Sequence, residues 1–523
     1  MQKPEPPSPR FEATVSELID ESEFSLGTSK AALVQTLKIP TQVLPEERAD
    51  NARRDLRALS FVTIDGEDAK DFDDAVYVER RKEGFRLWVA ISDVAHYVPE
   101  GSALDLHART RATSVYLINR VLPMLPERLS NQMCSLLPGQ ERLCLVADMV
   151  LDAQGRFLET EIYPALIQSA ARLTYEAVQS CFEGRPPKAL RPFLPMLENA
   201  RLLASRLHAL RAKRGALELQ LSERRLEVDA QGNPSQIRLS RQLESHRLIE
   251  AFMLRANEAV ARYAERRGLP VLFRCHGAPD DKKLRFFSKA VGAMGFSMDK
   301  PNPRAFSQLL GSVRGKPEER LLEHLLLRSM SQALYVAKNE GHYGLGSSAY
   351  LHFTAPIRRY PDLWTHRILK AHWAQKRLPA EERALSELGR HCSEREHMAM
   401  RLERDVVSCG GAYVAQKHLG KSFEGTLVGF AKRGCFIELD GLWVEGLLRL
   451  KELGRAAYFD EANYCFVLPN GRNLQLGMRC VVRIHEVYAR LGYVRLKCVS
   501  LPQEVSKGPK EGRKSKKFSK VAS

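Results

Sequence analysis

FVTIDGEDAKDFDDAVYVER, residues 61–80, is the most informative stretch of the chain, because it places four aspartates within ten residues. These aspartates are Asp65, Asp71, Asp73 and Asp74. Carboxylates this close together repel one another, and bringing them together costs free energy unless protons or cations neutralise them. Mg²⁺ suits such a site, since it prefers oxygen ligands and keeps positions open for water and phosphate. The stretch therefore indicates a metal site.

The segments on either side of the aspartates indicate that the acids are held in a folded sheet. Residues 61–64 and 75–78 read as short strands, and residues 82–85 read as a turn that leads to a third strand at 86–92. In an extended segment Phe72 would point away from its two acidic neighbours and into a core. A solvated acidic loop is the alternative interpretation, and it would require neither the strands nor the anchored ring.

The length, charge and cysteine usage of the chain bound its class. Its 523 residues are enough for roughly two to four domains. A formal charge of +17 favours a polyanionic partner, with nucleic acid as the leading candidate. No apolar run approaches the about 20 residues of a membrane span, and the N-terminus lacks a signal-peptide pattern. The ten cysteines contain no C-x-x-C pair, which favours reduced thiols in the cytoplasm over disulfides or zinc.

The pattern of the chain changes several times along its length. A lead-in of about fifty residues contains one candidate strand, residues 32–40, and a β-rich region with the aspartates follows to about residue 170. Helices are then predicted at residues 194–215, 245–268, 318–339 and 380–418. After Gly420, five short strands punctuated by glycine predict a small barrel of the OB type. The end of the chain, KGPKEGRKSKKFSK, is basic and poor in apolar residues, so we expect disorder there.

A second candidate site is the segment HFTAPIRRYPDL, residues 352–363, in which Arg358 and Arg359 precede a helix. Arginine suits bidentate contact with phosphate and does not lose its proton at working pH. An arginine that faces a phosphate can stabilise charge developing on the phosphoryl oxygens. A pair of surface or salt-bridged arginines is the alternative interpretation.

Aromatic and basic residues elsewhere are candidates for binding single-stranded nucleic acid. Tyr116 and Phe273 could offer rings on which bases stack, although each could equally pack in a core. On the predicted barrel, Lys432, Arg433 and Phe436 form a similar basic and aromatic group, and Phe436 could instead be buried. The long helix at 245–268 also carries two polar residues that could support functional side chains, Glu250 and Asn257.

Several long motifs of the chain resemble those of the ribonuclease II/R (RNB) family. The motifs are TIDGEDAKDFDDAV (63–76), TSVYLINRVLPMLPERLSNQMCSL (113–136), SHRLIEAFMLRAN (245–257), LFRCH (272–276) and HFTAPIRRYPDL (352–363). The form RRYPD and the lysine-rich end are more similar to the ribonuclease R branch. The resemblance implies an α+β fold, with a catalytic RNB domain of mixed strands and helices followed by a C-terminal OB-type S1 β-barrel.

The domain division that the resemblance implies has five parts. They are a lead-in at 1–52, an RNB catalytic domain at 53–376, a helical connector at 377–419, an S1-like RNA-binding barrel at 420–500 and a disordered basic tail at 501–523. Members of the family usually carry two cold-shock β-barrels before the catalytic domain, where this chain has about fifty residues. We therefore expect the lead-in to be a remnant of such a barrel.

The resemblance also implies an activity and assigns roles to residues. The family consists of Mg²⁺-dependent, processive 3′→5′ exoribonucleases that release nucleoside 5′-monophosphates. The metal ligands implied are Asp65, Asp71, Asp73 and Asp74, holding two Mg²⁺ ions, with Asp73 most critical for cleavage. By the same resemblance Arg358 assists catalysis, and the rings of Tyr116 and Phe273 clamp the 3′-terminal nucleotides.

The expected substrate is single-stranded RNA, or structured RNA with a 3′ overhang, and we expect a cytoplasmic monomer. Two other classes of function remain open. One is a catalytically weak RNA-binding regulator that uses the same fold. The other is a DNA-binding or translation-associated S1 protein, which would leave the acid cluster without a role. The presence of all four aspartates and of Arg358 favours the nuclease.

Overall fold

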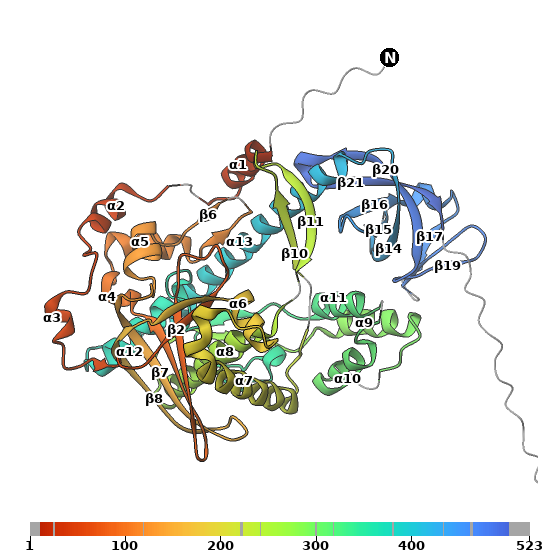
Figure 1. Ribbon diagram of the computed structural model, residues 1–523. Coiled ribbons are helices and arrows are strands. Elements are labelled where there is room, and N and C mark those ends of the chain that lie inside the picture. Colours follow the sequence, from red (N-terminus) through yellow and green to blue (C-terminus); the bar gives the residue numbers. More distant parts are fainter. Residues whose placement is uncertain are drawn as a thin grey trace, which may run out of the picture.

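The computed structural model describes most of the chain between residues 11 and 501 (Figure 1). The described residues are 11–24, 27–118, 120–219, 223–240, 242–298, 301–316, 318–378, 381–431, 433–460 and 464–501. Lys432 and the predicted tail beyond Leu501 lie outside the described residues. Among the described residues, no helix combines the length and the apolar character that crossing a membrane requires.

The N-terminal part is helical. It contains α1 (Phe11–Glu21), α2 (Lys30–Leu37) and α3 (Pro45–Arg48). The strand predicted over residues 32–40 is wrong, because this segment forms α2 and the turn after it. Ser29 begins the helix by accepting a hydrogen bond from the Ala32 N–H at 3.2 Å, and such a cap outweighs the weak β propensity of the segment. Whether the lead-in is the remnant of a cold-shock barrel stays a prediction.

A seven-stranded sheet carries the aspartates. Its order is β1–β8–β7–β4–β3–β2–β9, with β1–β8 and β2–β9 parallel and the other pairs antiparallel. The bounds are β1 (Arg54–Asp55), β2 (Val62–Asp65), β3 (Asp74–Arg81), β4 (Gly84–Ser92), β7 (Glu141–Asp152), β8 (Phe157–Gln168) and β9 (Ala171–Thr174). The three strands predicted around the acidic stretch are confirmed as β2, β3 and β4. Phe72 is 5% exposed and packs beside Phe61 and Trp88, as its predicted role as an anchor requires.

Helices cover this sheet. The helices after β4 are α4 (Val94–Tyr97), α5 (Ala103–Arg111), a π-helical turn (Leu129–Met133), α6 (Tyr175–Phe182), a 3₁₀ turn (Lys188–Phe193), α7 (Leu194–Arg214), α8 (Glu244–Arg266), α9 (Asp281–Ala293), α10 (Pro303–Val313), α11 (Glu319–Ser329), a second 3₁₀ turn (Tyr343–Leu345), α12 (Tyr360–Trp373) and α13 (Glu382–Gln416). The helices predicted at 194–215, 245–268 and 380–418 are confirmed as α7, α8 and α13. α7 packs on β3, and α8 packs on β4 and β7, which closes the main core.

The helix predicted over residues 318–339 is too long. The structure ends it as α11 and places β13 (Leu334–Val336) in the remainder, paired with β12 (Phe273–Cys275). Pairing with a strand about sixty residues earlier in the chain overrides the local helical pattern. The shorter strand pairs are β5 (Val115–Tyr116) with β6 (Val121–Leu122), and β10 (Glu223–Val228) with β11 (Pro234–Ser240).

The C-terminal part is a closed barrel with the strand order β14–β15–β16–β21–β20, which confirms the predicted five-stranded barrel. Its strands are β14 (Ser422–Ala431), β15 (Gly434–Leu439), β16 (Glu445–Arg449), β20 (Arg479–Tyr488) and β21 (Tyr493–Ser500). Two 3₁₀ turns (Leu450–Leu453 and Ala489–Leu491) and a small sheet of β17 (Tyr458–Asp460), β18 (Cys465–Val467) and β19 (Asn473–Leu474) complete it. α13 runs from the part of the fold around α12 to the barrel (Figure 1) and contacts α1, β11 and β13 on its way.

A glycine in α13 marks its closest approach to β13. A Cβ added to Gly389 would lie 2.5 Å from the carbonyl oxygen of Tyr335 and 3.1 Å from Leu272 Cδ2. We expect Gly389→Ala to lower the free energy of unfolding by about 1–3 kcal/mol, because backbone has to move. Gly311→Ala in α10 is the control, since its Cβ meets no described atom within 4 Å, and we expect no loss of stability. Urea unfolding measures both, and equal effects would contradict the close approach.

Candidate active site

The acidic stretch folds so that two of its aspartates sit on strands and two sit on the connection between them. Asp65 is the last residue of β2 and Asp74 is the first residue of β3. Asp71 and Asp73 lie on the connection, where Asp71 is half-buried and Asp73 is 4% exposed. The hairpin-like path and the buried Phe72 between the two acids therefore fix all four carboxylates near one edge of β2 and β3.

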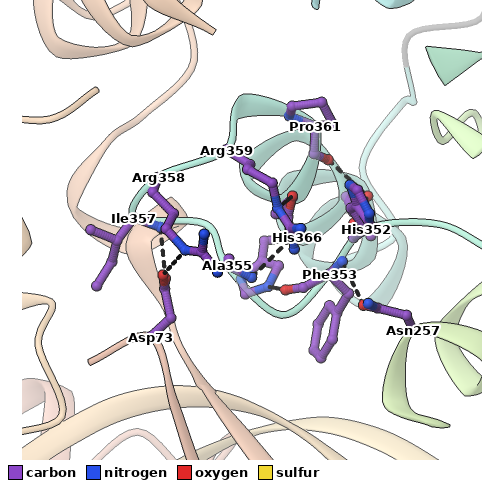
Figure 2. A network of polar contacts seen from close by, with 12 residues as sticks. Asp73, Asn257, His352, Phe353, Ala355, Ile357, Arg358, Arg359, Pro361 and His366 are labelled. Atoms are coloured by element: carbon purple, nitrogen blue, oxygen red, sulfur yellow. Dashed lines mark hydrogen bonds and ion pairs between the residues drawn. The ribbon is translucent and has the colours of Figure 1, made fainter. Parts of the chain in front are cut away.

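Asp73 is the most constrained of the four aspartates. Its Oδ1 accepts a hydrogen bond of 2.8 Å from the backbone N–H of Ile357, and its Oδ2 lies 3.6 Å from Arg358 Nε (Figure 2). Oδ2 has no hydrogen-bond partner among the described residues. Burial raises the pKa of Asp73 well above its ordinary value, and Asp71 and Asp74 raise it as well, against the opposing charge of Arg358. The positive charge of Arg358 is therefore not enough to favour the charged form of this carboxylate.

The charged forms of Asp74 and Asp65 are disfavoured as well. Burial raises the pKa of Asp74 to about 7, and the charge of Asp65 contributes to the shift while Arg358 opposes it. Burial also raises the pKa of Asp65, against a hydrogen bond of 2.7 Å from the Gly66 N–H to Asp65 Oδ1. Three neighbouring carboxylates that resist ionisation suit a cation, because a bound cation favours their charged form.

The predicted metal site fits this donor set in its chemistry but is not preformed. The donors are carboxylate oxygens, which suit Mg²⁺, and the buried Oδ2 of Asp73 lacks a partner that a cation would supply. Among the described residues, however, no three acidic, histidine or cysteine side chains converge closely enough to hold a metal ion. Asp71 instead accepts a hydrogen bond of 2.9 Å from the Tyr116 hydroxyl. Metal ligation by the four aspartates stays a prediction.

Arg358 lies at the break before α12, where its side chain is 47% exposed while its backbone is fixed. The Arg358 carbonyl accepts hydrogen bonds from the Ser114 N–H at 3.0 Å and from the Thr113 hydroxyl at 3.3 Å. The side chain can therefore face solvent and a ligand beside Asp73 without movement of the backbone. The catalytic role of Arg358 stays a prediction.

The neighbouring Arg359 is held differently. Its Nε and Nη2 donate to the two carboxylate oxygens of Asp362 at 2.9 and 2.8 Å, and Asp362 is fully buried. Arg359 is therefore a salt-bridged arginine, which was the alternative interpretation of the pair Arg358 and Arg359. RNA contact by Arg359 stays a prediction, and Nε and Nη2 of its guanidinium are already paired with Asp362.

The two predicted stacking rings have different surroundings. Tyr116 is 41% exposed and reaches the acid cluster through its hydroxyl, so its ring face is accessible beside the aspartates. Phe273 is 5% exposed and belongs to the main core. This burial favours the alternative of core packing, and base stacking at Phe273 stays a prediction. The cause of the burial is β12, which pairs with both β13 and Leu351 and turns this ring inward.

The predicted RNA-binding residues of the barrel belong to a different part of the fold from the four aspartates. Arg433 is exposed at the turn between β14 and β15, and Phe436 on β15 is half-buried. Both positions are open to a ligand, and their binding of RNA stays a prediction. The structure says nothing of Lys432, which is outside the described residues.

Two aromatic side chains near the acids were not predicted. The rings of Tyr175 and His246 stack with centroids 3.9 Å apart. Burial raises the pKa of Tyr175, and the charges of Asp65 and Asp74 add to the shift, which places its hydroxyl in the field of the aspartates. Tyr175 directly follows β9, the strand that pairs with β2, and only that pairing brings it to the acids. No local pattern in the sequence signals this.

A large cavity lies between the helices α7, α8 and α11 and the barrel. Its volume is about 1440 Å³, and its lining comes from α7, α8, α11, the β10–β11 hairpin and the barrel, in the region between α11 and β14 in Figure 1. Arg224 bridges Glu438 and Glu445 at 2.5 and 2.6 Å across it, and Arg320 also pairs with Glu438. None of the four aspartates lines the cavity, so it is distinct from the acid cluster.

Comparisons with known proteins agree with this architecture. A family model described as "RNB domain" matches residues 53–375. The chain is 40% identical over 472 residues to Ribonuclease R of Thermotoga maritima, covering 87% of this chain and 66% of that protein. It is 37% identical over 495 residues to Ribonuclease R of Escherichia coli, covering 90% of this chain and 60% of that protein. The chain thus spans less than two thirds of the length of these relatives.

Among solved structures, the chain is similar to RNase R of Mycoplasma genitalium in complex with ribose methylated single-stranded RNA. The TM-score is 0.89 at 28% sequence identity, and the match covers 94% of this chain and 78% of that one. The agreement therefore extends over both the catalytic part and the barrel.

Proposed function

This chain belongs to the RNB family, and from that membership we propose that it is an exoribonuclease that degrades RNA processively from the 3′ end. The proposed reaction is hydrolysis of the terminal phosphodiester with release of nucleoside 5′-monophosphates. The observation that carries the proposal is the contact between Asp73 and Arg358, at 3.6 Å. It lies in a cluster of carboxylates whose charged forms are disfavoured, because burial raises the pKa of Asp73 and of Asp74. This arrangement suits a phosphate and a cation together.

The roles of the residues follow from their surroundings. Mg²⁺, in our proposal two ions held by Asp65, Asp71, Asp73 and Asp74, would supply Lewis-acid chemistry that activates water and supports the leaving 3′ oxygen. Arg358, whose guanidinium is half-exposed beside Asp73, would donate to the phosphoryl oxygens on which charge develops. The Ile357 N–H keeps Asp73 Oδ1 occupied, which leaves Oδ2 as the oxygen that can change partners.

The proposed substrate is single-stranded RNA, or structured RNA with a 3′ overhang. The formal charge of +17 supports a polyanionic partner. The relative from Mycoplasma genitalium has been captured with single-stranded RNA, which supports the same class of ligand here. We propose that the protein acts as a monomer in the cytoplasm, and the ten free cysteines are consistent with a reducing compartment.

One experiment separates this proposal from the alternatives. A 5′-labelled RNA and its DNA counterpart are each incubated with the protein, with Mg²⁺ and with a chelator. We expect a ladder that shortens from the 3′ end on RNA alone, and only with Mg²⁺. RNA that is bound but never shortened would support a catalytically weak RNA-binding regulator. Binding of DNA without any cleavage would support an S1-type binding protein, and either result contradicts the nuclease.

The ring of Tyr116 provides a prediction about substrate contact. We expect Tyr116→Ala to weaken RNA binding by about 1–3 kcal/mol, because a base loses its stacking partner. Tyr116→Phe should keep most of the affinity, since it removes only the hydroxyl bound to Asp71. Fluorescence anisotropy with labelled RNA measures both, in an Asp73→Asn background that keeps the RNA intact. Equal losses in the two variants would show that the hydroxyl matters and the ring does not.

A further inference from the structure

The loop that carries Arg358 is fixed by a regular set of side-chain acceptors. Within residues 352–359, the backbone N–H groups of Phe353, Ala355 and Ile357 each donate to the Oδ1 atom of a side chain, at 2.9, 2.8 and 2.8 Å. The three acceptors come from different elements: Asn257 on α8, Asp362 on α12 and Asp73 in the acidic connection. Figure 2 shows this series running along the loop from Asn257 to Asp73.

Asn257 is the first member of the series and is itself held at both ends. It is 2% exposed, its Oδ1 accepts from the Phe353 N–H, and its Nδ2 donates to the Tyr350 hydroxyl at 3.1 Å. The amide group therefore cannot rotate without losing a hydrogen bond, and a buried amide without partners is costly. α8 is a rigid support for Asn257, because Phe252, Ala256 and Val260 of this helix are buried in the main core.

The carbonyl group of the same residue, Phe353, is held by a side chain of α12. His366 is fully buried, and its Nε2 donates to the Phe353 carbonyl oxygen at 2.9 Å. Burial lowers the pKa of His366 to about 4, so the ring is neutral and this nitrogen carries the single ring proton. The backbone of Phe353 is thus fixed at its N–H by α8 and at its carbonyl oxygen by α12.

Only four residues separate Phe353 from Arg358, and the next two donors in the series lie between them. A shift of Phe353 would be transmitted along this short stretch to Arg358 and would change the distance between the Arg358 side chain and Asp73. Misplacement of a group that faces the reacting phosphate by about 1 Å can reduce a rate by about 100-fold. Asn257 thus controls geometry at a site that it does not touch.

We propose that Asn257 is a positioning residue that sets the distance between Arg358 and Asp73 by holding the Phe353 amide. The proposal rests on the proposed nuclease function. Asn257 makes no contact with either residue, so it acts through the loop alone. The Asp362 carboxylate, fixed by Arg359, supports the middle of the same loop.

The first test compares the effect of Asn257 on cleavage with its effect on binding. Under single-turnover conditions with excess enzyme, Asn257→Ala should slow RNA cleavage by roughly 10- to 100-fold, with the dissociation constant for RNA changed less than about 2-fold. Asn257→Asp keeps the Oδ1 acceptor and should recover most of the rate. If the alanine variant does not fold, Asn257→Ser carries the same expectation, since its side chain is too short to reach Phe353.

Tyr350→Phe is the matched control. It removes the other hydrogen bond of Asn257 but leaves the bond to the Phe353 N–H, so it should lower the melting temperature without slowing the single-turnover rate. If Asn257 only stabilises the fold, the cleavage rates of Tyr350→Phe and Asn257→Ala should either both fall or both stay at the parent rate. That result would overturn the proposal.

A double-mutant cycle then tests the route through Arg358. In an Arg358→Ala background, Asn257→Ala should slow cleavage by less than about 2-fold, because the group that it positions is gone. A further loss of 10-fold or more in that background would overturn the inference while leaving the nuclease function intact. A parent protein that binds RNA but does not cleave it would contradict the proposed function and, with it, this inference.

Discussion

Replacement of Asp73 by asparagine is expected to abolish RNA cleavage, with a loss on the order of 10³-fold or more, while RNA binding stays intact or tightens. Asparagine keeps the shape of the side chain and can still accept the Ile357 N–H through Oδ1. It replaces the anionic Oδ2, which faces Arg358 and lacks a hydrogen-bond partner among the described residues, by a neutral N–H donor. A bound cation would then lose a ligand, and Arg358 would lose its counter-charge.

The fold should tolerate this substitution. Burial and the neighbouring carboxylates raise the pKa of Asp73, so its charged form is disfavoured in the absence of a cation. Neutralising it should not lower the melting temperature measured without metal. Asp68→Asn is the matched control, because Asp68 lies in the same acidic stretch but its side chain is 90% exposed. We expect cleavage by Asp68→Asn at the parent rate, and near-parent cleavage by Asp73→Asn would contradict the assignment.

The largest effect on stability is expected at Asp93, which joins α12 to the central sheet. Asp93 is fully buried and accepts from Lys370 Nζ at 2.8 and 2.7 Å and from Arg53 Nη2 at 2.8 Å. Asp93→Asn should lower the free energy of unfolding by about 3–5 kcal/mol, because it leaves two positive groups without their shared partner. Urea unfolding followed by circular dichroism measures the change.

The control for Asp93→Asn is an exposed ion pair. Arg54 and Glu161 lie 2.7 Å apart with side chains 48% and 46% exposed, so Glu161→Gln should change stability by less than about 1 kcal/mol. Equal effects of the two substitutions would show that the buried cluster does not stabilise the fold.

The pH dependence of the Asp93 effect follows from the sign of its pKa shift. Burial raises the pKa of Asp93, but Lys370 and Arg53 outweigh burial and hold it below its ordinary value. A lowered pKa contributes stability that is fully present above the unfolded value of about 3.9 and is lost as the pH falls through the folded value. The difference between the parent and Asp93→Asn should therefore be constant from roughly pH 5 to 8 and shrink only in stronger acid.

Local patterns predicted the features that depend on neighbours in sequence. Alternation around the acids predicted β2 to β4 and the buried Phe72, and helical periodicity predicted α7, α8 and α13. The glycine-punctuated strands after Gly420 predicted a closed barrel. In each case the burial of one face repeats with the period of the element, so the pattern is visible in the sequence itself.

A distant segment decides the structure at Phe273 and in the last part of the helix predicted over residues 318–339. Phe273 is buried because β12 pairs with β13 and Leu351, far away in the chain. The same pairing ended the predicted helix at Ser329 and made a strand from its last part. Nothing local to either segment shows the other, so sequence reasoning could not choose between a stacking ring and a core ring.

The two arginines of the RRYPD segment illustrate a finer limit. They are adjacent, yet Arg358 faces Asp73 while Arg359 is paired with Asp362. Asp362 lies three residues after Arg359, at a spacing that allows contact across the first turn of α12, so this pairing was open to prediction. The approach of Arg358 to Asp73 depends on the tertiary placement of the loop, and only the structure gives it.

The identity of the first product tests the central claim most directly, which is that Asp73 and Arg358 form a metal-dependent site for hydrolysis at the 3′ end of RNA. RNA labelled at its 3′-terminal nucleotide is incubated with the parent protein and with Asp73→Asn, and the products are separated by chromatography. We predict that, with Mg²⁺, the parent releases the label as a nucleoside 5′-monophosphate before any shorter internal fragment forms, and that Asp73→Asn releases none. Release as a nucleoside without a 5′-phosphate, cleavage that starts internally, or equal release by both proteins would contradict the account.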